Sequence, residues 1–202
     1  MGHLIEKPKT TKKAFNPKDA VLVFSSFSFV CVAIIFALIV YDVLTIQDFL
    51  SFDNPLKMVM GIVIFSIGLL LFGIIISLCI PSKYIDDTNK SYQNFSVSTI
   101  IAFLFIGALF EEILFRGIIQ NLLYVFMENQ WLAIIITTLL FIGMHIQYFK
   151  KPIMLLNITV PGLAFCWIYF ETNNLLVPLL VHFLMNLGIT LLLKYNLIRL
   201  KK

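Results

Sequence analysis

Six long apolar stretches decide what this sequence can fold into. They are Ala20–Tyr41, Leu56–Ile80, Val97–Met127, Trp131–Phe149, Ile153–Phe170 and Leu175–Leu193. Each is long enough to form a helix that crosses a hydrocarbon layer of about 30 Å. Lipid offers backbone amides no hydrogen-bond partners, so such segments form helices or a closed barrel, and the alternating pattern of barrel strands is absent. The sequence therefore predicts an all-α fold, a polytopic membrane bundle of about six transmembrane helices.

Composition excludes a water-soluble globule. The chain of 202 residues is 60% hydrophobic and 13% charged, whereas soluble domains are roughly 45–50% apolar and about 25% charged. Its net charge of +4 comes from short basic clusters between the apolar stretches, which is typical of membrane proteins, and no nucleic-acid partner is expected. The lipid bilayer is the first expected partner. The short chain without an additional domain favours an integral protein of a bacterial cytoplasmic membrane.

Basic residues gather in alternate connections between the stretches. One set of tails and connections carries Lys7, Lys9, Lys12, Lys13, Lys18, Lys83, Lys90, Lys150, Lys151, Lys194, Arg199, Lys201 and Lys202. The other connections carry the acids Asp42, Asp48, Asp53, Glu128 and Glu171, with Lys57 as the basic residue near them. Because basic residues are retained on the cytoplasmic side of a membrane, both termini are predicted to be cytoplasmic.

The third stretch contains a polar break, with Glu111, Glu112 and Arg116 inside an otherwise apolar helix. Glu112 and Arg116 are four residues apart with the acid first, which favours an ion pair within the helix. Glu111 is rotated about 100° from Glu112 and needs a partner on another helix, or its own proton. A network that only joins helices is the alternative interpretation, but ionisable residues within a membrane usually mark a functional site.

Two histidines lie in other apolar stretches. His145 closes the fourth stretch, and His182 lies in the sixth with Asn186 four residues later. On a helix His182 and Asn186 share one face, which points an imidazole and a carboxamide the same way into the bundle. Singly, each histidine is more often a hydrogen-bond partner between helices. Together with the surplus carboxylate of Glu111, they suggest one polar site.

These residues resemble the motifs of the CAAX protease and bacteriocin-processing family, abbreviated CPBP and also called Abi, which is related to the type II CAAX prenyl endopeptidases. The pattern Glu-Glu-x-x-x-Arg is met by Glu111, Glu112 and Arg116, Phe-x-x-x-His by Phe141 and His145, and His-x-x-x-Asn by His182 and Asn186. The resemblance covers roughly residues 97–188. The first two stretches lie outside it and contribute nothing to the motifs.

The resemblance implies an intramembrane endopeptidase that hydrolyses a peptide bond within a polar cavity. In such enzymes Glu111 and His145 would activate water, and His182 and Asn186 would stabilise the intermediate. The residue types suit this chemistry, because hydrolysis needs a general base and hydrogen-bond donors for the developing oxyanion. The four residues therefore form the expected catalytic set.

Glu112 and Arg116 would support that set through their ion pair. On this interpretation the chain divides into a cytoplasmic basic tail at 1–19, two N-terminal membrane helices at 20–95, a CPBP-like catalytic membrane core at 96–194 and a second basic tail at 195–202.

A site that holds zinc is the alternative to a metal-free site. The sequence has no His-Glu-x-x-His motif, and Glu111, His145 and His182 either hold a zinc ion or hold water alone. With Glu112 offset by Arg116, an ionised Glu111 leaves one negative charge to be neutralised by a cation, by a protonated histidine or by its own proton. We expect a metal-free site with a proton shared between Glu111 and His145 through water.

The expected substrate is a membrane-associated peptide, a leader peptide or a lipidated protein tail. Two other functions compete with the peptidase. One is a non-catalytic membrane scaffold or a bacteriocin self-immunity protein of the same fold, and the other is a small proton-coupled transporter, although no inverted repeat supports it.

The depth of the three candidate residues poses a geometric problem. At about 1.5 Å per residue, Glu111 and His182 each lie about 18 Å from the predicted inner boundary, whereas His145 lies only about 7 Å from Lys150. Either tilt brings the three residues to one level, or the turn Gln147–Lys151 is drawn into a water-filled cavity.

Overall fold

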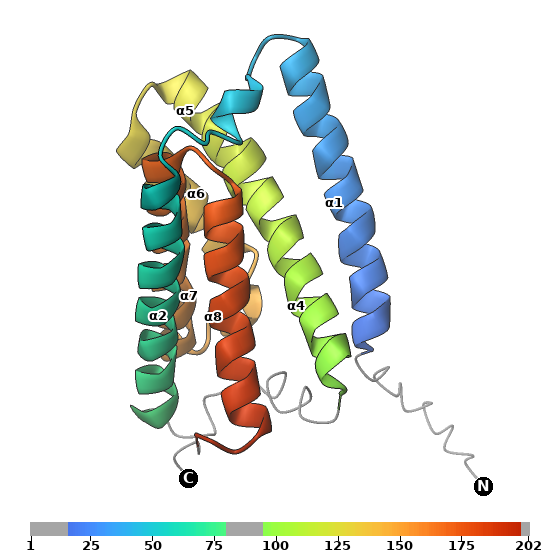
Figure 1. Ribbon diagram of the computed structural model, residues 1–202, viewed down its shortest axis with the longest axis vertical. Helices are drawn as coiled ribbons and strands as arrows, with labels where there is room; N and C mark the ends of the chain where they lie inside the picture. The colour runs from blue at the N-terminus through green and yellow to red at the C-terminus, as the bar shows by residue number, and fades with distance from the viewer. Residues whose placement is uncertain (1–15, 80–94, 199–202) are drawn as a thin grey trace, which may run out of the picture.

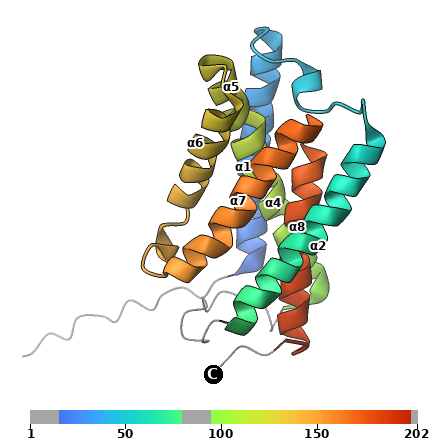
Figure 2. The ribbon, with the colours of Figure 1, turned by 90° about the vertical axis from the view of Figure 1, so that its left-hand side faces the viewer.

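The protein is a helical bundle, seen in a computed structural model that describes residues 16–79 and 95–198 (Figure 1). Its elements are α1 (Pro17–Val40), η1 (Ile46–Asp48), α2 (Pro55–Cys79), α4 (Val97–Glu112), η4 (Ile113–Gln120), α5 (Asn121–Met127), α6 (Gln130–Gly143), η5 (Ile146–Tyr148), α7 (Pro152–Thr172) and α8 (Leu176–Lys194). Among the described residues, five segments are long and apolar enough to cross a membrane, and they run lengthwise through the bundle (Figure 2): α1, α2, the continuous run α4–η4–α5, α7 and α8. The predicted all-α polytopic bundle is confirmed.

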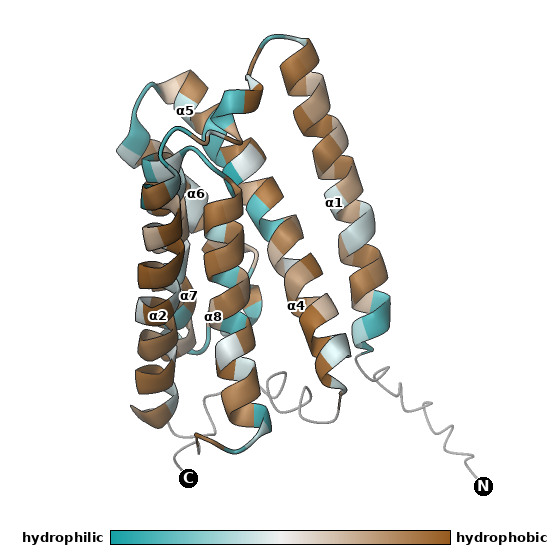
Figure 3. Cartoon of the chain, viewed as in Figure 1, coloured by the Kyte–Doolittle hydropathy of each residue, from teal (hydrophilic) through white to brown (hydrophobic). Residues whose placement is uncertain are grey.

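Charge is segregated between the two ends of the bundle. The start of α1 and the end of α8 lie at one end, with the end of α2 and the start of α4 (Figure 1). Figure 3 shows apolar residues along the helices and hydrophilic residues gathered at their ends and connections. At the opposite end Lys57 forms an ion pair with Glu171 at 2.8 Å. The predicted basic residues within 1–15, 80–94 and 199–202 lie outside the described residues.

The orientation of the bundle is tested by labelling single cysteines from outside intact cells. With the three native cysteines replaced by serine, Lys150→Cys should resist a membrane-impermeant thiol reagent and Asp53→Cys should react, because basic residues mark the cytoplasmic side. Both positions are exposed, so accessibility of the side chain itself does not distinguish them. Labelling of Lys150→Cys from outside would overturn the topology.

The fourth apolar stretch is not one helix, and here the prediction is wrong. It was expected to run over Trp131–Phe149, but α6 ends at Gly143 and His145 lies in the turn that follows. The backbone N–H of His145 donates to the carbonyl of Ile142 rather than to that of Phe141. The Phe141 carbonyl instead forms a hydrogen bond with Nδ1 of the His145 ring, at 2.8 Å. The side chain thus replaces the main-chain donor of the next helical turn, which ends the helix.

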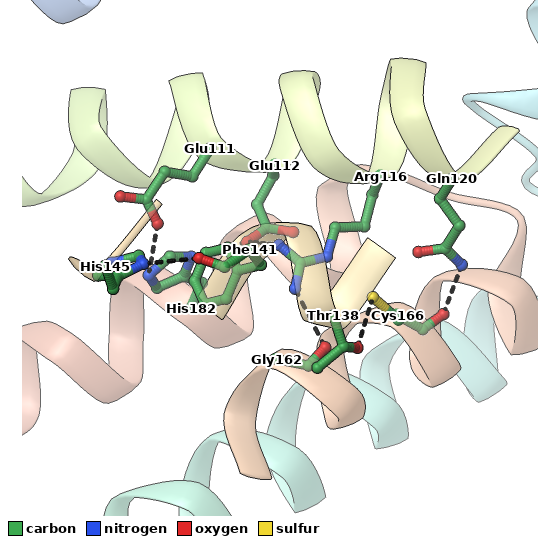
Figure 4. Close-up of polar contacts among 10 residues, drawn as sticks. All are labelled: Glu111, Glu112, Arg116, Gln120, Thr138, Phe141, His145, Gly162, Cys166 and His182. Atoms are coloured by element: carbon green, nitrogen blue, oxygen red, sulfur yellow. Dashed lines mark hydrogen bonds and ion pairs between the residues drawn. The ribbon is translucent and has the colours of Figure 1, made fainter. Parts of the chain in front are cut away.

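The third stretch is a continuous helical run that contains a π-helix, η4. Such wide turns are rare and are frequent at functional sites. Arg116 and Gln120 both reach from η4 to main-chain carbonyls of α7, donating to Gly162 at 3.1 Å and to Cys166 at 2.8 Å (Figure 4). These contacts fix the polar part of this run against α7.

Candidate active site

The predicted residues come together inside the bundle, around a cavity of about 280 Å³. Its polar lining includes Glu111 from α4, His145 from the α6–α7 connection, and His182 and Asn186 from α8. Figure 4 shows Glu111, Glu112 and Arg116 projecting from one helical run toward the two imidazoles and α7. The Asn186 carboxamide makes no hydrogen bond within the part of the chain that the structure describes. His182 and Asn186 share one helix face, as predicted.

The predicted ion pair between Glu112 and Arg116 is present, with Nη1 of Arg116 3.2 Å from Oε1 of Glu112 and both side chains fully buried. The guanidinium also donates to the Gly162 carbonyl and lies 5.0 Å from the ring centre of Phe141 and 5.3 Å from that of Phe165. A Cβ at position 162 would lie 3.3 Å from the Phe141 ring, so α7 packs closely against α6 at this glycine. Arg116 is therefore held by charge, hydrogen bonding and aromatic contact together.

His182 lies between the two acids. Its Nδ1 is 2.7 Å from Oε1 of Glu112, and its Nε2 is 3.8 Å from Oε2 of Glu111. The first distance is a hydrogen bond to an ion-paired carboxylate, so Nδ1 carries a proton. The second is longer than a hydrogen bond and leaves Nε2 able to serve another group. Phe165 stacks on the imidazole at 4.8 Å and fixes its plane.

His145 is oriented by the end of α6. Its Nδ1 lies 2.8 Å from the Phe141 carbonyl, which can only accept, so Nδ1 is the protonated nitrogen and Nε2 of the neutral ring is a free acceptor. Tyr148 stacks against the ring at 6.0 Å and also lines the cavity. Thus the connection after α6 forms part of the cavity wall.

The two acids occupy different environments, as their rotation on the helix predicted. The Glu112 side chain is fully buried, whereas that of Glu111 is 24% exposed. The imidazole in contact with Glu111 is that of His182. Among the described residues no direct contact joins Glu111 to His145, the histidine with which we expected it to share a proton through water.

Sequence reasoning missed two parts of the site. It gave Glu112 only Arg116 as a partner, whereas Glu112 also binds His182. It also left the first two stretches without a role, whereas α2 forms one wall of the cavity through Leu69, Leu70, Phe72, Gly73, Ile76 and Ser77. These α2 residues are mostly apolar, and nothing in their type or spacing distinguishes a cavity wall from a surface facing lipid.

The three residues of the alternative zinc site, Glu111, His145 and His182, do not lie at the spacing of metal ligands. Both histidines carry their Nδ1 protons toward acceptors, which is how metal-binding histidines are usually oriented. However, in residues 16–79 and 95–198 no three His, Cys, Asp or Glu side chains converge at the spacing of metal ligands. Glu111, His145 and His182 therefore do not fit a shared metal ion in this arrangement.

Comparison with known proteins finds a family that is similar to the segment carrying the site. Residues 93–188 match the family described as type II CAAX prenyl endopeptidase Rce1-like. The uncharacterised protein YpbD of Bacillus subtilis (strain 168) is 29% identical over 109 residues, which cover 52% of this chain and 53% of the relative. An uncharacterised 24.3 kDa protein of Escherichia coli is 32% identical over 87 residues, covering 43% of this chain and 40% of the relative.

The chain thus matches about half, or less, of the length of these curated relatives. No solved structure shows significant similarity to it. The matched segment contains all three motifs, from Glu111 to Asn186, and the helices that hold them around one cavity. Over residues 93–188, just under half of the chain, this membrane protein is thus similar to the Rce1-like family of type II CAAX prenyl endopeptidases, which agrees with the resemblance of its motifs.

Proposed function

We propose that the protein is an intramembrane endopeptidase that hydrolyses a peptide bond in a membrane-associated peptide, leader peptide or lipidated protein tail. One observation carries the proposal. A partly exposed carboxylate, Glu111, faces the imidazole of His182 across 3.8 Å in a cavity that also holds the free amide of Asn186. This arrangement supplies a base and oxyanion donors at one place, which peptide hydrolysis requires.

Hydrolysis follows from these groups in two steps. Glu111 takes a proton from water while the oxygen attacks the scissile carbonyl carbon, and the carbonyl oxygen becomes an oxyanion that accepts hydrogen bonds from Nε2–H of His182 and the amide of Asn186. The C–N bond then breaks, and the proton on Glu111 passes to the leaving amine. In the same scheme the free Nε2 of His145 accepts a hydrogen bond from the attacking water and orients it.

One additional proton neutralises the group formed by Glu111, Glu112, Arg116 and His182 and prepares it for this reaction. Arg116 offsets Glu112, so a single further proton balances Glu111. It can lie on Glu111 or on Nε2 of His182, since Glu112 already fixes the proton on Nδ1. The form with ionised Glu111 and a protonated His182 ring contains both the base and the oxyanion donor. Glu112 and Arg116 act as positioning residues, because they hold the imidazole in the required orientation.

The proposal is tested by comparing the peptides in membranes that contain wild-type protein with those in membranes that contain Glu111→Gln. Peptides present only with the wild type would identify the substrate and the bond that is cleaved. A self-immunity protein or scaffold would instead keep its protective effect in Glu111→Gln without any difference in peptides. A proton-coupled transporter would show flux that depends on a proton gradient. We place the protein in a bacterial cytoplasmic membrane, as its bacterial relatives suggest.

Replacing Asn186 with alanine should lower kcat about 100-fold, which is the usual contribution of one oxyanion donor. The carboxamide makes no hydrogen bond in the described structure, so the fold should not change. The measurement is turnover of a substrate peptide at saturation, with the melting temperature as control. Asn186→Asp, which is similar in size but lacks the amide donor, should be at least as impaired. Wild-type kcat in either variant would remove Asn186 from the mechanism.

Activity should persist after exhaustive chelation, since the proposed reaction uses only side chains and water. Purified active protein is dialysed against a zinc chelator, and its metal content and turnover are measured in parallel. Stoichiometric zinc in active protein, lost with activity on chelation and restored with it, would show that a metal is required. Such a result would leave Glu111 as a candidate base.

A further inference from the structure

Asn157 has no role in the reaction proposed above, although it lines the same cavity as Glu111 and His182. Its carboxamide makes no hydrogen bond in the described part of the chain. A polar side chain within a membrane helix normally finds a partner on a neighbouring helix. Asn157 instead lines the cavity with a carboxamide, two donors and an acceptor, that has no partner in the described part of the chain.

The main chain at the same residue also lacks its usual partner. Pro161 lies four residues later within α7 and lines the same cavity. Proline has no N–H, so the Asn157 carbonyl receives no α-helical hydrogen bond from position 161. This position of the cavity wall therefore combines a side-chain amide with a main-chain carbonyl that lacks its α-helical donor.

The polar groups of the cavity lie at successive positions along the axes of α7 and α8. Phe165 stacks on His182 at 4.8 Å, so these two residues lie at the same level. Asn157 precedes Phe165 by eight residues, which places it about 12 Å nearer the start of α7. Asn186 follows His182 by four residues on the antiparallel helix α8, about 6 Å in the same direction. An extended peptide rises about 3.3 Å per residue, so 12 Å corresponds to three or four residues.

We propose that Asn157 is a substrate-positioning residue. Its carboxamide, together with the carbonyl left without a donor by Pro161, binds the main chain of an extended peptide three or four residues from the cleaved bond. The inference rests on the proposed peptidase function. It specifies an extended peptide because carbonyl and carboxamide groups pair with backbone N–H and C=O groups, which a lipid chain does not have.

The test measures KM and kcat with a synthetic quenched-fluorescence peptide that spans the cleavage site found in the membrane comparison. Asn157→Ala should raise KM roughly 2- to 12-fold, the range for a neutral hydrogen bond, and leave kcat nearly unchanged. Pro161→Ala supplies an N–H to the Asn157 carbonyl and should raise KM similarly. Pro178→Ala is the matched control, because Pro178 lies in the first turn of α8, where no main-chain donor is needed.

A second set of peptides tests the contact itself, with each backbone amide replaced in turn by an ester. For the wild type, one ester three or four residues from the cleaved bond should raise KM, and this penalty should shrink in Pro161→Ala. Wild-type KM in both Asn157→Ala and Pro161→Ala, or a loss in kcat alone, would overturn the inference while the peptidase assignment stands. If the wild type cleaves no peptide in the membrane comparison, the proposed function fails and the inference fails with it.

Discussion

Replacing Glu111 with glutamine should abolish cleavage and preserve the fold. The amide has nearly the shape of the carboxylate but does not accept a proton from water, and a general base contributes about 10²–10⁴-fold to the rate. The Glu111–His182 distance of 3.8 Å exceeds a hydrogen bond, so little structural stabilisation is lost. The substitution also removes a charge from the interior of the bundle. The measurements are turnover of the substrate peptide and melting temperature in the same preparation.

The neighbouring acid provides the matched control. Glu112→Gln makes the same chemical change one residue away, but at a fully buried side chain that binds both Arg116 and His182. It should lower the melting temperature and the folded yield, whereas Glu111→Gln should not. Turnover retained in Glu111→Gln would disprove its role as base. Equal destabilisation of the two variants would show that Glu111 is structural.

Replacing Arg116 with alanine should lower folded yield more than it alters the chemistry of the protein that survives. Removal of one partner of a buried ion pair costs roughly 3–5 kcal/mol, because the other charge stays buried without compensation. Here the change also removes a hydrogen bond to the Gly162 carbonyl and contacts with aromatic rings. Yield and thermal stability in detergent, together with turnover per folded molecule, measure the two effects separately.

A double variant distinguishes lost charge balance from lost packing. Glu112→Gln with Arg116→Met removes both charges and keeps much of the side-chain volume, and neutral replacement of a buried pair is often tolerated. Its yield should exceed that of Arg116→Ala. Normal yield with abolished turnover in Arg116→Ala would contradict the expectation and give Arg116 a direct part in the reaction.

The bilayer made much of this fold predictable from sequence. Long apolar stretches must be helical in lipid, and spacing on one helix was enough to predict the pairing of Glu112 with Arg116. Spacing could not decide which imidazole faces Glu111, because that depends on the rotation and depth of separate helices. The end of α6 was missed because the connection after it is itself apolar, with Ile146 and Phe149 both exposed. Hydropathy records apolar residues and does not record whether their backbone is helical.

The shortness of α6 has a consequence for the lipid around the protein. Its 14 residues extend about 21 Å, which is about 9 Å less than a typical hydrocarbon layer. After a short apolar connection come Lys150 and Lys151. We therefore expect the adjacent leaflet to thin, or to draw headgroups and water inward, to meet their charged groups. Hydrophobic mismatch at one helix thereby brings an aqueous boundary closer to Glu111. Lipid chain length, by setting the thickness of that leaflet, becomes a determinant of how easily a polar peptide reaches the site.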